Sequence, residues 1–167
     1  MMLRVKKILC PLDFSEASYR ALDYAVGLSS SLGAELCLVH VLPRVAEPAW
    51  ARPLHCNPDE VSLVLSEYEG ALYTSAQRKL HEVIRQRLPE DTKPRAVVRV
   101  GEAAVEIMNA ADEESADLIV IASRGLSGRP DVFGSVAERV SRLAKRPVLI
   151  VPACGESDRL DTPKEEN

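Results

Sequence analysis

The chain alternates between short runs rich in apolar residues and longer amphipathic segments. The apolar runs predict five strands, at 7–12, 35–42, 95–100, 117–122 and 147–152. Four of these runs show little polar alternation, which is typical of strands buried on both faces of a parallel sheet. The run at 95–100 alternates in character, and it therefore predicts a strand at an edge of the sheet.

Apolar residues at helical spacing between these runs predict four helices. The helices cover residues from about 15 to 32, from about 61 to 88, 103–114 and 135–144. Either Asp13 or Ser15 caps the first helix, and an Asp13 cap would complete a capping box with Glu16. Gly33 is expected to end this helix. In the second helix the apolar side carries Leu65, Leu72, Ala76, Leu80, Val83 and Ile84.

The alternation of strands and helices defines the predicted architecture. It favours an α/β fold, in which right-handed crossovers place helices on both faces of a five-stranded parallel sheet. Residues 1–152 are expected to form a single domain, and the polar residues 153–167 a disordered C-terminal tail. The segment 43–59 carries four prolines and the only tryptophan, and it is predicted to be a loop.

Composition narrows the classes of function. Apolar residues make up 46% of the 167 residues and charged residues 28%, which is ordinary for a globular protein. Much of the net charge of -4 lies in the tail, so the rest of the chain offers no clustered basic surface for nucleic acid. No run approaches the roughly 20 apolar residues that span a bilayer, and no secretory signal is recognisable.

The cysteine pattern points to a reducing compartment. Cys10, Cys37, Cys56 and Cys154 show no CxxC spacing, which indicates neither a disulfide framework nor a zinc site. Together with the missing signal, this pattern predicts a cytoplasmic protein. The pair His55 and Cys56 near Asp59 is interpreted as part of a solvated loop rather than a metal or redox site.

The residues that could carry chemistry follow the ends of predicted strands. In open parallel sheets, ligands bind beyond the carboxyl ends of the strands, where the strand order reverses. Asp13 follows the first strand, Val41 lies at the end of the second, and the loop 122–135 follows the fourth. Glycines in this loop allow close approach of a ligand, and the helix after it offers free N–H groups to an anion. The loop therefore predicts a phosphate site.

Two interpretations of Ser135 stay open. Its hydroxyl would bind a phosphate, with added charge from Arg124 and Arg129. Alternatively, Ser135 and Glu138 form a capping box that only starts the helix, and this interpretation is favoured for the residue taken alone. The same two interpretations apply to Asp13, which is either a helix cap or a ligand contact.

Several motifs are similar to those of the universal stress protein family, over roughly residues 4–152. They are ILCPLDFS at 8–15, RVGEAA at 99–104, ADLIVIASRGLSG at 116–128, GSVAERV at 134–140 and RPVLIV at 146–151. This resemblance implies a Rossmann-like domain and a homodimer in which the strand 147–152 pairs with its copy. For one branch of the family it also implies binding of ATP or AMP, with Asp13 and Val41 around the adenosine.

The phosphate loop of that branch has the form G-x2-G-x9-G-[ST], and the chain departs from it twice. Ala122 replaces the first glycine, and only eight residues separate Gly125 from Gly134 and Ser135. A methyl group at 122 would crowd a ligand or forbid a positive φ. The shorter loop, with Pro130 lacking an N–H, changes which amides point at the phosphates.

The favoured hypothesis is a universal stress protein that binds ATP or AMP and acts in stress response or signalling, with hydrolysis slow or absent. The predicted cofactor-binding residues are Pro11, Asp13, Val41, Ala122, Gly125, Gly134, Ser135 and Val136. Whether magnesium accompanies the phosphates stays open. The alternative is a dimeric interaction module of the same family without nucleotide. An ATP-dependent ligase or nucleotidyl transferase is disfavoured, since the chain has no GxxxxGK[ST] loop.

Overall fold

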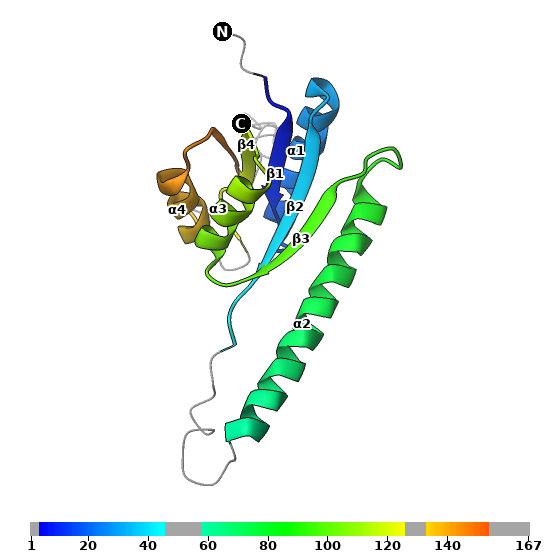
Figure 1. Cartoon of the computed structure of the whole chain (residues 1–167). Helices are drawn as coiled ribbons and strands as arrows, with labels where there is room; N and C mark the ends of the chain where they lie inside the picture. The colour runs from blue at the N-terminus through cyan, green and yellow to red at the C-terminus, as the bar shows by residue number, and fades with distance from the viewer. Residues whose placement is uncertain (1–3, 46–57, 126–132, 154–167) are drawn as a thin grey trace, which may run out of the picture.

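The computed structural model describes residues 4–45, 58–125 and 133–153 (Figure 1). Its five strands are β1 (Lys7–Pro11), β2 (Glu35–Leu42), β3 (Arg95–Val100), β4 (Leu118–Ala122) and β5 (Val148–Val151). They form one parallel sheet in the order β3-β2-β1-β4-β5, which confirms the predicted fold and the edge position of 95–100. The predicted tail beyond residue 153 and most of the predicted loop 43–59 lie outside the described residues.

Helices cover both faces of this sheet, as predicted. The described helices are α1 (Glu16–Leu32), α2 (Pro58–Arg87), α3 (Ala103–Glu113) and α4 (Ser135–Leu143). Their buried residues place α1 and α2 on one face and α3 and α4 on the other (Figure 1). None of these helices is long and apolar enough to cross a membrane.

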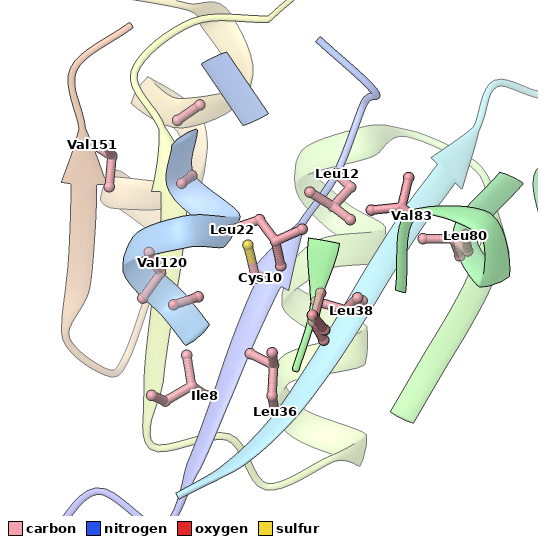
Figure 2. Packing of buried hydrophobic residues seen from close by; sticks show 14 of the residues in the cluster. Ile8, Cys10, Leu12, Leu22, Leu36, Leu38, Leu80, Val83, Val120 and Val151 are labelled. Carbon is pink, nitrogen blue, oxygen red and sulfur yellow. The ribbon is translucent and has the colours of Figure 1, made fainter. Parts of the chain in front are cut away.

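Successive residues of the central strands fill two separate core clusters. On β1, Ile8 and Cys10 pack toward α1 and α2, whereas Leu9 packs toward α3 and α4. Figure 2 shows Ile8 and Cys10 on the first of these faces with Leu22 of α1. Because both faces of a central strand are buried, its sequence has no polar face, and this explains the apolar runs without alternation.

Helix α2 extends beyond the sheet at its N-terminal end (Figure 1). Its C-terminal half buries Ala76, Leu80 and Val83 against the sheet. Leu65 and Leu72, predicted on the same side of the helix, are only half-buried. The predicted apolar side is therefore covered only where the helix reaches the sheet.

The N-termini of α1 and α4 test two predictions about which residues cap these helices. Ser15 is the N-cap of α1, and its hydroxyl accepts a hydrogen bond from the N–H of Ser18 at 3.1 Å. The alternative Asp13 cap is thus wrong. The N-cap of α4 is Gly134, which has no side chain to cap the helix, and Ser135 is its first residue, so the favoured capping box of Ser135 and Glu138 is also wrong.

Candidate functional site

The order of the strands reverses between β1 and β4. From β1 the chain passes through α1 to β2, and from β3 it returns through α3 to β4 on the other side of β1. The helices of these two crossovers lie on opposite faces of the sheet. A crevice therefore opens beyond the carboxyl ends of β1 and β4, which is where ligands bind in sheets of this kind.

A cavity of about 280 Å³ lies at these strand ends. Its walls come from the ends of β1, β2 and β4 and from the first turns of α1, α3 and α4. All of the predicted binding residues line it, namely Pro11, Asp13, Val41, Ala122, Gly125, Gly134, Ser135 and Val136. Their convergence is a property of the fold, while their contact with a nucleotide stays a prediction.

An apolar wall of this cavity was missed by the sequence analysis. It consists of Val39 of β2, Ile121 of β4, and Ala103 and Ile107 of α3. Ala103 and Ile107 are four residues apart and so share a helix face, a signal that was visible in the sequence. Val39 and Ile121 carried no such signal, because a residue of a fully buried strand looks the same whether it lines a cavity or fills the core.

Asp13 is held tightly in the turn between β1 and α1. Its Oδ1 accepts hydrogen bonds from the backbone N–H of Ser15 at 3.0 Å and from the Ser15 hydroxyl at 2.5 Å. The intervening residue, Phe14, has a φ of 65°, in the left-handed region that residues with a Cβ rarely adopt. The turn thus fixes the carboxylate at the edge of the cavity.

The two loop glycines are required for close packing. A Cβ at Gly125 would overlap Oδ2 of Asp13, so the backbone of one strand end lies directly against the carboxylate of the other. A Cβ at Gly134 would lie 3.1 Å from the carbonyl oxygen of Ser123, to which the Gly134 N–H donates at 2.8 Å. Neither glycine has a positive φ. Glycine is therefore needed at these positions because there is no room for a side chain, and not because of the backbone conformation.

Two helix N-termini contribute to the cavity. Ala103 at the start of α3 and Ser135, Val136 and Ala137 at the start of α4 line it. Within the part of the chain that the structure describes, neither N-cap residue, Glu102 or Gly134, caps its helix through a side chain, and the positive ends of the two helix dipoles face the cavity. Each helix has a glutamate in its first turn, Glu106 in α3 and Glu138 in α4, but α3 also has Glu102 as its N-cap, so α4 offers the better position for a phosphate.

Of the charged and possible metal-binding residues considered from the sequence, some lie at the cavity and others lie outside the described residues. Arg124 lines the cavity, whereas Arg129 and Pro130 lie outside the described residues, as do His55 and Cys56. No group of three or more potential metal-ligating side chains occurs among the described residues.

The fold and the cavity define a class of protein, a doubly wound α/β domain with a cavity at the switch point of its sheet. The model of the universal stress protein family matches residues 4–152. The universal stress protein YxiE of Bacillus subtilis is 32% identical over 147 residues, which cover 87% of this chain and 97% of YxiE. The chain therefore belongs to the universal stress protein family.

Solved structures agree with this assignment. The structure of MJ0577, a universal stress protein of Methanocaldococcus jannaschii, has a TM-score of 0.75 and 26% identity, covering 91% of this chain and 99% of that one. A universal stress protein from Archaeoglobus fulgidus in complex with dAMP has a TM-score of 0.51 and 24% identity, over 89% and 98% of the two chains. At 24% identity, the similarity to the second structure supports the fold only.

Proposed function

We propose that this universal stress protein binds an adenine nucleotide, ATP or AMP, in the cavity at the switch point of its sheet. It acts in the cytoplasm, in stress response or signalling, with little or no catalysis. The observation that carries the proposal is the close approach of Gly125 to the Asp13 carboxylate, which brings a carboxylate and a glycine loop together beside the N-terminus of α4.

The cavity offers each part of such a ligand a matching surface. Apolar side chains such as Val41 and Ile107 suit a purine base. The side-chain oxygens of Asp13 accept hydrogen bonds, and they suit the hydroxyl or amino donors of a nucleoside. The N-terminal N–H groups of α4, with the Ser135 hydroxyl and the nearby Arg124, suit a phosphate.

The two departures from the family loop differ in their consequences. Ala122 lies in β4 and pairs in register with Val151, and its φ is not positive. A glycine is thus not required there for backbone reasons, and only the methyl group remains as an intrusion into the cavity wall. The shortened spacing falls within residues 126–132, which lie outside the described residues.

Binding is tested on protein stripped of bound small molecules by unfolding and refolding. Calorimetry with ATP and with AMP is expected to give one site per chain, and GTP serves as the control for base selectivity. Titration with ATP in the presence and absence of magnesium decides whether the metal accompanies the phosphates, since Mg²⁺ is bound in large part by substrate phosphates. No binding at millimolar nucleotide would overturn the proposal.

A second observation supports a homodimer through residues 147–152. β5 is an edge strand of the sheet, and Leu149 on it is 37% exposed. An apolar strand edge favours pairing with another chain. This edge also favours the alternative function, a dimeric interaction module without nucleotide, and the calorimetry above separates the two functions.

A further inference from the structure

Three side chains from separate elements meet directly beside Asp13. The ring of Phe14, in the turn after β1, lies 4.3 Å from the imidazole ring of His40 of β2, centroid to centroid. The ammonium group of Lys79 of α2 lies 4.4 Å from the centroid of the same Phe14 ring. Phe14 is therefore contacted both by an aromatic ring and by a cation, each of which stabilises its position.

His40 is itself fixed in place. Its Nδ1 donates a hydrogen bond of 2.7 Å to the carbonyl oxygen of Leu12, the residue just before Asp13. Burial and the nearby Lys79 lower the pKa of His40, while this hydrogen bond and Asp13 act in the opposite direction. Because its pKa is lowered, the ring is mostly uncharged at neutral pH, and its plane is tilted by 38° to that of the Phe14 ring.

The backbone of Phe14 needs this support. Its φ of 65° is unfavourable for any residue with a Cβ, and such a conformation persists only where the surrounding structure holds it. Phe14 is also the single residue between Asp13 and Ser15, which are joined by two hydrogen bonds. The conformation of Phe14 therefore sets the direction of the Asp13 carboxylate.

We propose that Phe14, held in its left-handed conformation by His40 and Lys79, is a positioning residue that aims the Asp13 carboxylate into the nucleotide cavity. The inference rests on the proposed function, because the carboxylate is aimed at the place where a nucleotide would bind. The three residues lie outside the cavity lining and act on the ligand only through Asp13.

The opposing explanation is that Phe14 only adds apolar packing. Its ring is partly buried against the core cluster on the side of α1 and α2. A packing role predicts a loss of stability when the ring is removed, with no separate effect on Asp13. The two explanations are distinguished by a change that leaves the core intact, and Lys79 allows one, since it is exposed.

The experiment compares two cation–π contacts that α2 makes. Lys79→Met removes the charge above Phe14, and Arg87→Met is the matched control, because Arg87 lies 4.0 Å from the ring of Tyr19 and away from the cavity lining. Phe14→Ala removes the ring but keeps the Cβ that disfavours the left-handed backbone, and Phe14→Tyr retains the ring. For each variant, the dissociation constant of AMP and the hydrogen-exchange rate of the Ser15 amide are measured.

Lys79→Met is expected to weaken AMP binding about two- to fivefold, because an exposed cation–π contact is a weak one. Phe14→Ala is expected to weaken it about tenfold. Both variants are expected to speed exchange at Ser15, because the Asp13 carboxylate leaves that amide. Arg87→Met and Phe14→Tyr are expected to match the unaltered protein in both measurements. If Lys79→Met and Phe14→Ala bind AMP as the unaltered protein does, the inference is wrong.

Failure of the proposed function has a different signature. An unaltered protein that binds no adenine nucleotide removes that function and, with it, the affinity effect of the variants. The Ser15 exchange rates still decide the positioning in the ligand-free protein. Equal rates in all variants would show that Phe14 does not hold Asp13.

Discussion

The α-carbon of Gly125 lies directly against the carboxylate of Asp13, although the two residues follow different strands. A side chain at 125 would overlap Oδ2 of Asp13. Gly125→Ala must therefore displace either the carboxylate or the loop. We expect this variant to bind AMP about tenfold more weakly, because about 1.4 kcal/mol of binding free energy corresponds to losing one well-placed contact. Calorimetry measures the loss.

A matched control for that substitution is Gly27→Ala. Gly27 is exposed in α1, and a Cβ there would have no neighbour within 4 Å. This variant is expected to bind AMP normally and to gain about 0.5–1 kcal/mol of stability from the higher helix propensity of alanine. Normal AMP affinity in Gly125→Ala would contradict the assignment of Gly125 to the site.

Two serines at helix starts have different roles. Ser15 caps α1 through its hydroxyl, so Ser15→Ala is expected to lower the free energy of unfolding by about 1 kcal/mol. Ser135 follows the N-cap Gly134 as the first residue of α4, so Ser135→Ala is expected to change stability by less than about 0.5 kcal/mol while it weakens nucleotide binding. Urea unfolding and calorimetry measure the two effects. A stability loss in Ser135→Ala equal to that in Ser15→Ala would restore the capping role.

These serines illustrate which features the sequence could predict. The strand runs and the glycine-serine loop predicted the sheet and the residues around the cavity, because apolar runs and strand ends are local features. The choice between Asp13 and Ser15 as cap depends on the backbone conformation of the turn, which the residue types did not reveal. Phe14 is left-handed and the Asp13 carboxylate accepts from Ser15 itself, while the Ser15 hydroxyl caps α1.

The apolar side of α2 was predictable only in part, for a related reason. Its helical spacing is the same along its length, but burial depends on where the sheet ends. Ala76 and Leu80 are buried against the sheet, whereas Leu65 and Leu72, nearer the N-terminal end, are only half-buried. A periodic pattern indicates which side of a helix is apolar, and the neighbouring elements determine how much of that side is covered.

Arg146 stabilises the end of α3. Its Nη1 donates hydrogen bonds to the carbonyl oxygens of Ala111 at 2.5 Å and Ala116 at 2.6 Å, and its Nη2 pairs with Asp112. Arg146→Met is expected to cost about 2 kcal/mol, because it leaves part-buried acceptors without this donor. The control is Arg142→Met, whose ion pair with Glu138 is largely exposed and is expected to contribute less than about 0.5 kcal/mol. If urea unfolding shows the same loss of stability for Arg146→Met and Arg142→Met, this role of Arg146 is refuted.

The buried thiols make stability depend on pH in the alkaline range. Burial raises the pKa of Cys37 to about 11 and raises that of Cys10 above its ordinary range. The unfolded chain loses these protons near pH 8.5, so the unfolded state binds fewer protons there, and stability is expected to fall as pH rises from about 8.5 toward 11. Urea unfolding at several pH values measures this slope, and Cys37→Ala is expected to reduce it.

The same thiols are expected to resist labelling at neutral pH. In a variant with Cys56→Ser and Cys154→Ser, a thiol reagent at pH 7.5 is expected to react only after unfolding, because the thiolate is the reactive form and both side chains are buried. Fast labelling of the folded protein would contradict the predicted protonation and burial.

The two edges of the sheet carry exposed apolar residues of similar size, and this allows a direct test of the dimer. Leu149 on β5 is 37% exposed, and Val100 on β3 is 38% exposed. If two copies pair through β5, Leu149→Lys places like charges in the interface and is expected to give a monomer, since like-charge contacts cost several kcal/mol. Val100→Lys, at the opposite edge, is expected to leave the dimer intact. Light scattering across micromolar concentrations measures the molar mass of each variant. If only Val100→Lys dissociates the dimer, the interface lies at β3 and not at β5.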